Sequence, residues 1–291
     1  MIALRSYNYR HSSSHIEGIL LRAKDTCLTT MHNSQQLLSL SLPFPRQEHH
    51  IYWSGRVKDP YSPTLEATMT RPPTRENIVT VARRAVGALR RRGLSCYLVG
   101  SMASMLWETD RAPNDIDIVI LITTYDAEAI KRLLVASDKR FFLVPSRNPR
   151  NTYKVLWYEI PTASRFSNVF EEIKVDILVP PTLNMPFLDG DNIVWKEELP
   201  VCPLLPLLLL RLQGWEDHIQ ATRRDLVEKQ YTDVMDIKEL LAIAVEAGVT
   251  IEDEPWLDRP FLSAARRRIQ SYVRIRRGSR ASWRKLGFVL R

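Results

Sequence analysis

Apolar residues recur along most of the chain with two different periods, and the period changes at turn-forming residues. A spacing of three and four residues predicts a helix, and alternation of apolar and polar positions predicts a strand. The first such helix begins at Thr74, a residue that can cap it, and ends at Gly93. The elements expected after it are a strand over 95–99, a helix over 100–107, a strand over 115–122, a helix over 126–135, strands over 141–144, 153–160 and 173–179, and helices over 204–218, 231–248 and 260–276.

This order of elements predicts an α+β fold. A mixed sheet with flanking helices is expected over residues 75–200, followed by a small helical domain over 201–276. Residues 1–74 show neither period and are rich in Ser, His, Gln and Pro, so we expect a largely disordered tail. An alternative is that translation begins at Met69. Residues 277–291 are expected to form a basic C-terminal tail.

The composition indicates an intracellular protein, in the cytoplasm or the nucleus. Three widely spaced cysteines argue against a disulfide framework and favour a reducing compartment. The longest apolar run, 201–210, is interrupted by Pro203 and Pro206 and is about half the length of a membrane span. Glu17 and Asp25 disfavour a mitochondrial transit peptide. No membrane partner is therefore expected.

The positive charge of the chain is concentrated at its C-terminal end. The formal net charge is +8, but residues 261–291 hold ten Lys and Arg residues and no Asp or Glu, which leaves −2 for the rest. Tyr272, Trp283 and Phe288 lie among these basic residues. Basic and aromatic side chains together can bind phosphates and stack on bases, so RNA is a candidate partner of this segment. The alternative is a helix with a solvated basic face and a frayed end.

Two carboxylates stand in the strand that is expected over residues 115–122. Side chains alternate between the faces of a strand, so Asp115 and Asp117 project together while Ile116 and Ile118 project from the other face. Carboxylates this close repel each other unless a cation lies between them or one is protonated. Their oxygen atoms suit Mg²⁺ or Mn²⁺. The alternative is a strand edge with two solvated aspartates.

Two further features favour a metal and phosphate site over solvated aspartates. The strand expected over 173–179 also alternates, with Ile173, Val175, Ile177 and Val179 on one face and Asp176 on the other, so Asp176 would supply a third carboxylate if the two strands pair. Gly100 and Ser101 join a strand to a helix. Glycine allows a phosphate to approach the backbone closely, and N–H groups at a helix start can bind an anion.

The order of these motifs resembles that of the polymerase-β-type nucleotidyltransferase superfamily. An apolar-Gly-Ser turn is followed after thirteen residues by an Asp-apolar-Asp strand and later by an apolar-Asp-apolar strand. The resemblance covers residues 95–180 and implies a nucleotidyltransferase-type mixed sheet.

Other residues resemble the bacterial abortive-infection and toxin-type members of that superfamily. Arg111 begins a segment similar to their Arg-x-Thr-x-Asp-x-Asp motif, with Pro113 where Thr is common. Arg211 is placed like the basic residue of their apolar helix. Residues 230–237 resemble their Lys-Asp-x-x-Asp-apolar segment without the lysine, and Lys229 is close enough to replace it.

Residues 229–236 also have a simpler interpretation. Asp233 and Asp236 lie on one helical face with Lys229, which predicts a charged surface patch or a cap. His218, at the end of an apolar helix, is interpreted as a partner of the helix dipole.

The resemblance implies an enzyme that transfers a nucleotidyl group from a nucleoside triphosphate, such as ATP, with two metal ions. Asp115 and Asp117 would hold both ions, and Asp176 would ligate one and help to deprotonate the attacking hydroxyl. Gly100 and Ser101 would bind the β- and γ-phosphates. The acceptor would be RNA or a protein hydroxyl; the alternative is a non-catalytic nucleotide- or RNA-binding module. Three basic residues could balance the triphosphate charge, with a solvated surface cation as the alternative for each: Arg111, Arg211 and Lys229.

Overall fold

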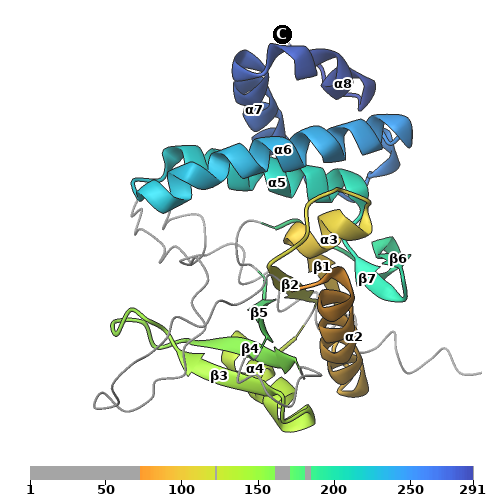
Figure 1. The fold of residues 1–291 in the computed structure, drawn as a ribbon. Helices are drawn as coiled ribbons and strands as arrows, with labels where there is room; N and C mark the ends of the chain where they lie inside the picture. The colour runs from red at the N-terminus through yellow and green to blue at the C-terminus, as the bar shows by residue number, and fades with distance from the viewer. Residues whose placement is uncertain (1–72, 122, 161–170, 181–184, 291) are drawn as a thin grey trace, which may run out of the picture. The chain divides into compact units, whose positions relative to one another are not determined.

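The computed structural model describes residues 73–121, 123–160, 171–180 and 185–290 (Figure 1). The expectations for residues 1–72, including the alternative start at Met69, lie outside this part. In chain order the elements are α2 (Arg75–Arg91), β1 (Cys96–Val99), α3 (Gly100–Leu106), β2 (Asp115–Ile120), α4 (Ala127–Ser137), β3 (Phe141–Pro145), β4 (Lys154–Ile160), β5 (Glu171–Leu178), β6 (Val194–Lys196), β7 (Leu199–Val201), α5 (Leu204–Gln220), α6 (Arg224–Glu246), α7 (Arg259–Ile275) and α8 (Arg280–Lys285), with short 3₁₀ turns η3 (Gly190–Asn192), η4 (Ile251–Asp253) and η5 (Arg277–Ser279).

Seven strands form one mixed sheet in the order β3-β4-β5-β2-β1-β7-β6. The pairs β2–β5 and β1–β7 are parallel, and the other neighbouring pairs are antiparallel. A parallel pair needs a long connection between its strands. Between β2 and β5 the chain forms α4, β3 and β4, so residues far apart in the sequence become neighbours at the centre of the sheet.

One face of the two central strands is apolar and fully buried. Ile116 and Ile118 of β2, and Ile173 and Val175 of β5, have no exposed surface. Helix α2 contacts β2, helix α4 contacts β5, and the two helices contact each other. Burying an aliphatic side chain of this size stabilises the fold by about 2 kcal/mol. The same alternation that buries the isoleucines directs the polar residues of both strands to the opposite face.

The amphipathic helix α2 forms where the sequence predicts it. Thr74 is its N-cap, and its hydroxyl oxygen accepts a hydrogen bond from the Asn77 N–H at 3.2 Å. Such a cap contributes about 1 kcal/mol. Gly93 follows the helix with φ +72°, a left-handed conformation that glycine adopts without strain.

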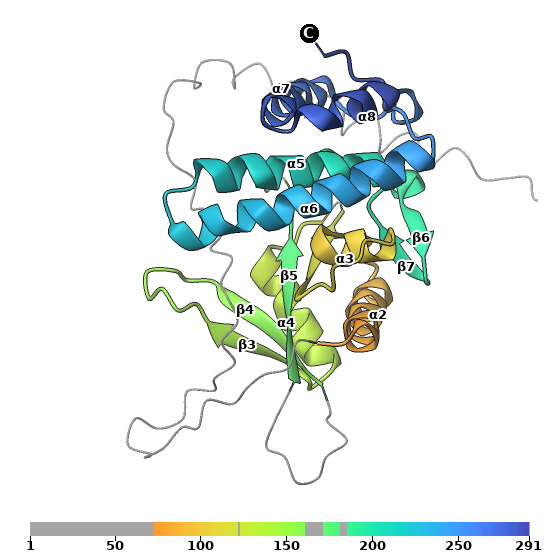
Figure 2. The same cartoon turned by 45° about the horizontal axis from the view of Figure 1, so that its top comes forward.

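The C-terminal helices form a layer beside the sheet. Helices α5 and α6 lie side by side, and β5 points toward them (Figure 2). Helix α7 packs on α5, and α8 packs on α6. In both views α7 and α8 lie on the side of α5 and α6 opposite the sheet (Figures 1 and 2). None of the described helices is long and apolar enough to cross a membrane.

The α+β fold predicted from the sequence is confirmed, with three local differences. The strands β6 and β7 were not predicted, because each has only three residues. Helix α6 begins at Arg224, seven residues before the predicted start, because its first turns are polar and show no apolar period. Residues 277–290, predicted as a basic tail, contain η5 and α8. The division into domains stays a prediction.

Candidate metal and nucleotide site

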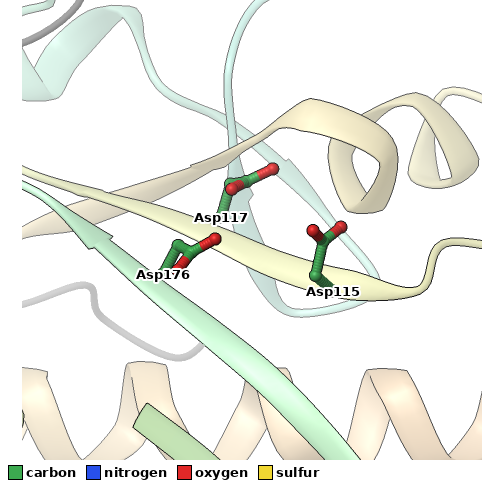
Figure 3. A group of neighbouring side chains, drawn as sticks. All are labelled: Asp115, Asp117 and Asp176. Atoms are coloured by element: carbon green, nitrogen blue, oxygen red, sulfur yellow. The ribbon is translucent and has the colours of Figure 1, made fainter. Parts of the chain in front are cut away.

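The three aspartates identified in the sequence lie together on the polar face of β2 and β5. The two strands pair in parallel, and Asp117 lies opposite Asp176 in the register. One oxygen atom from each of Asp115, Asp117 and Asp176 lies within 4.8 Å of the other two. Figure 3 shows the three carboxylates on the same side of the neighbouring strands. This cluster can bind a divalent metal ion, because carboxylate oxygens are the ligands that Mg²⁺ and Mn²⁺ prefer.

The negative charge of this cluster is incompletely compensated. Burial raises the pKa of Asp117 well above its usual range, and the charges of Asp115 and Asp176 raise it further. Lys174 and Arg211 act in the opposite direction. A cation between the carboxylates would relieve their repulsion.

Glycine suits position 100, which lies close beside Asp117. Its φ is +65°, and a Cβ atom built on it would overlap Oδ2 of Asp117. Both the backbone conformation and the close approach therefore favour glycine at this position. The turn that the sequence marks as Gly100-Ser101 consequently lies directly against the carboxylate cluster.

Ser101 is held by two arginines from distant parts of the chain. Its Oγ accepts hydrogen bonds from Nη2 of Arg111 at 2.7 Å and from Nη2 of Arg211 at 2.9 Å. The side chain of Ser101 is buried. Three of the predicted nucleotide-binding residues are thus in direct contact.

Both arginines are bound to one buried aspartate of α6. Arg111 donates to Asp236 from Nε at 2.8 Å and from Nη2 at 2.6 Å, and Arg211 Nε lies 3.4 Å from Asp236 Oδ2. The carboxylate of Asp236 raises the pKa of Arg111. Nε of Arg211 is buried, and among the described residues it has no hydrogen-bond acceptor. Asp236 therefore orients both guanidinium groups toward the Gly100-Ser101 turn.

The interpretation of Asp233 and Asp236 as a surface patch or cap is wrong. Both carboxylates are buried, because α6 turns this face toward α5. Asp233 interacts with Nδ1 of His218 at 2.5 Å, and Asp236 with the two arginines. A helical period identifies one face of a helix but does not reveal that a second helix covers part of it.

Lys229, the remaining predicted nucleotide-binding residue, is half-buried on α6. Burial lowers the pKa of Lys229, and the charges of Asp115 and Lys174 are near enough to affect it. It therefore lies on the side of α6 that approaches the carboxylate cluster.

Lys174 was not identified from the sequence, yet it contacts the cluster. Its Nζ donates to Asp176 Oδ2 at 2.6 Å. Burial alone would lower the pKa of Lys174, but the adjacent carboxylates, Asp176 first, raise it above its usual value. The signal was available: Lys174 stands two residues before Asp176 in an alternating strand, which places both on the same face.

The aromatic residues of the basic segment are not available for stacking on bases. Tyr272, Trp283 and Phe288 are buried. With Trp215 of α5 they form a chain of edge-to-face contacts, with ring centroids 4.9 to 6.4 Å apart. The hypothesis that these rings stack on bases is therefore wrong, because they are buried in contacts that join α5, α7 and α8.

Known proteins resemble this chain in structure rather than in sequence. No family model and no curated protein matches it. An antigenic nucleotidyltransferase-like protein from Paracoccidioides brasiliensis superposes with a TM-score of 0.56 at 15% identity, over 76% of this chain and 97% of that one. The chain has a nucleotidyltransferase-type fold. JHP933 from Helicobacter pylori gives a TM-score of 0.43 at 13% identity, over 68% of this chain and 74% of that one.

Proposed function

We propose that the chain is a metal-dependent nucleotidyltransferase that moves a nucleotidyl group from a nucleoside triphosphate to a hydroxyl acceptor. The observation that carries this proposal is the convergence of three carboxylates within 4.8 Å beside the Gly100-Ser101 turn. A bound Mg²⁺ or Mn²⁺ would supply charge neutralisation for the phosphates. Asp115, Asp117 and Asp176 would be its ligands.

The protein's own residues would position the triphosphate and accept a proton. The acceptor oxygen attacks the α-phosphorus, the bond from that phosphorus to the bridging oxygen breaks, and pyrophosphate leaves. Asp176 takes the proton of the hydroxyl. Phosphoryl-type transfer depends on positioning and charge neutralisation more than on covalent help. Gly100 and Ser101 would contact the β- and γ-phosphates, with charge supplied by Arg111, Arg211 and Lys229.

The test is transfer of label from each α-³²P nucleoside triphosphate by the full chain, with Mg²⁺ or Mn²⁺ and with RNA or protein acceptors. We expect transfer from at least one nucleotide, and none from the γ-labelled form, because the γ-phosphate leaves with pyrophosphate. Asp117→Asn keeps the shape of the side chain and removes its charge, and should lower the rate by about 1000-fold or more. Transfer that persists in this variant would contradict the proposed site.

The surface of the C-terminal helices favours RNA as the acceptor or as a bound partner. Eight basic residues there are exposed, and none has an ion pair with a described acidic residue. Arg268, by contrast, is bound to Glu216 at 2.9 Å. The eight residues, called the basic surface below, are Arg266, Arg267, Arg274, Arg276, Arg277, Arg280, Arg284 and Lys285.

The composition of the basic surface suits a phosphate backbone. Seven of its eight members are arginines, and a guanidinium group binds phosphate with two parallel hydrogen bonds. Arg267 and Arg274 are seven residues apart on α7, roughly 10 Å along the helix axis. Because the aromatic rings are buried, binding would depend on phosphates rather than on base stacking. The surface would therefore anchor RNA with little sequence preference.

This part of the proposal is tested by fluorescence anisotropy with a labelled RNA oligonucleotide. The triple charge reversal Arg274→Glu, Arg277→Glu and Arg280→Glu should weaken binding about tenfold or more at 0.1 M salt. The matched control reverses three exposed arginines elsewhere, Arg91, Arg92 and Arg132, and should retain binding. Each set includes one arginine from the last turn of a long helix, Arg274 and Arg91 respectively.

Equal losses in the two triple variants would overturn the assignment of RNA to the basic surface. Binding to anionic phospholipid vesicles without binding to RNA would also overturn it. RNA binding with no label transfer from any nucleotide would instead favour the alternative function, a binding module that keeps the fold without catalysis.

A further inference from the structure

The carboxylate cluster already contains a cation that belongs to the protein. Lys174 of β5 lies opposite Asp115 in the register of the parallel strands and two residues before Asp176. Its ammonium group bonds to Asp176 Oδ2 at 2.6 Å, and its side chain is 17% exposed. The charges of Asp115 and Asp117 also act on it. One lysine thus faces all three carboxylates.

The charges of the cluster distinguish between one and two metal ions. With all three carboxylates ionised, the carboxylates and the Lys174 ammonium group carry two net negative charges, and the nearby charges of Arg211 and Lys229 offset these further. One divalent ion is therefore already enough to balance the site. Two divalent ions beside the ammonium group would leave an excess of positive charge until a triphosphate binds. Like charges in a partly buried site repel strongly, because little solvent screens them.

We infer that Lys174 is a built-in counter-ion of the cluster, so that the nucleotide-free chain takes up a single divalent ion. The Lys174 ammonium group occupies the place beside Asp176 that a second ion would need. In the nucleotide-free chain Asp115 and Asp117 are therefore the first ligands of the ion, and Asp176 becomes a ligand only where the ion displaces Lys174. This inference rests on the proposed function for the identity of the site. It modifies the two-ion arrangement that the sequence resemblance implies.

A lysine in this place also has a consequence for ion affinity. An incoming divalent ion is repelled by the ammonium group and competes with it for Asp176. Removing the ammonium group without changing the length of the side chain much should therefore improve ion binding. Lys174→Met does this, because methionine fills a similar volume and carries no charge.

The experiment is titration of the full chain with Mn²⁺ in the absence of nucleotide, followed by calorimetry and by the electron paramagnetic resonance of free Mn²⁺. We expect one Mn²⁺ for the wild type. Lys174→Met should bind a second ion or bind the first at least about tenfold more tightly. Lys174→Arg keeps the charge and should behave like the wild type. Lys139→Met, at an exposed site, removes the same charge from another surface and should also leave binding unchanged.

Two results would overturn the inference: two Mn²⁺ ions bound by the nucleotide-free wild type, or identical Mn²⁺ binding by the wild type and Lys174→Met. Lys174→Gln serves as a second neutral variant, and circular dichroism establishes that each variant is folded. The label-transfer assay separates this inference from the proposed function. If label is transferred but Lys174→Met binds Mn²⁺ as the wild type does, only the inference is contradicted. If no label is transferred but Lys174→Met shows the expected gain in Mn²⁺ binding, only the proposed function is contradicted.

Discussion

The chain has two sets of arginines that differ in burial and in their acidic partners. Arg111 and Arg211 are 31% and 17% exposed, and they share the carboxylate of Asp236, which is 3% exposed. The arginines of the basic surface are exposed and have no acidic partner among the described residues. The first set is fixed in direction by hydrogen bonds and ion pairs to Asp236 and Ser101, and the second is exposed to solvent.

This difference separates two ways of binding phosphate. Arginines that are oriented before the ligand arrives can place individual phosphate oxygens, because little conformational entropy is lost on binding. Solvated arginines attract a polyanion collectively, and salt weakens that attraction. The first set therefore suits a nucleoside triphosphate at a defined position, and the second suits the backbone of a long RNA.

The largest expected effect follows from removing the shared partner of the first set. Asp236→Asn removes the one carboxylate that two mostly buried guanidinium groups share. Such a change should lower the free energy of unfolding by about 2 to 4 kcal/mol. Urea denaturation measures it. A loss below about 1 kcal/mol would show that the two arginines do not depend on Asp236.

The next effect concerns catalysis. Arg211→Met removes the guanidinium group beside Ser101 and should reduce the rate of label transfer by about 100-fold. RNA affinity, measured by anisotropy, should change by less than about twofold, because the basic surface is intact. Similar losses in both quantities would mean that the two sets of arginines act on one ligand.

Salt should distinguish the two sets without any mutation. For single-stranded nucleic acid, the logarithm of the binding constant falls with the logarithm of the salt concentration by about 0.7 per neutralised phosphate. If four phosphates are neutralised, raising NaCl from 50 to 200 mM should therefore weaken RNA binding about 50-fold. The KM for the nucleotide should rise by at most about threefold, because oriented and partly buried groups are screened less. Comparable salt dependence for nucleotide and RNA would break the distinction.

The smallest effect belongs to an exposed ion pair. Arg224 and Glu228 of α6 are 3.1 Å apart, with both side chains largely exposed. Glu228→Gln should change the free energy of unfolding by at most about 0.5 kcal/mol. Measured beside Asp236→Asn in the same helix, it separates the effect of burial from that of charge. A cost close to that of Asp236→Asn would contradict the importance of burial.

The sequence predicted the carboxylate face of the sheet better than the helical side of the site. Alternation alone placed Asp115 and Asp117 together, and the pairing of β2 with β5 brought Asp176 beside them. Strand alternation is a local property, so it can be read without knowing the neighbours. The same rule would have placed Lys174 in the cluster.

The contacts of Asp236 could not be predicted in that way. They depend on how α6 packs on α5 and on where the segment before β2 passes, and no local period carries that information. Likewise, Tyr272 and Trp283 could be assigned to a surface or to a core only once α7 had been placed on α5. Residues 1–72 lie outside the described part, so their predicted disorder stays a prediction.

The parallel pairing of β2 and β5 also determines when the site can exist. Asp117 and Asp176 are neighbours only after α4, β3 and β4 have formed the connection between their strands. Closing so long a connection is slow and costly in chain entropy. The unfolded chain therefore has no preformed ligand set, and a divalent ion binds the native state selectively. Above its dissociation constant, each tenfold increase in ion concentration should add about 1.4 kcal/mol to the apparent stability. The rise in unfolding temperature with Mn²⁺ concentration therefore reports whether β2 and β5 are paired.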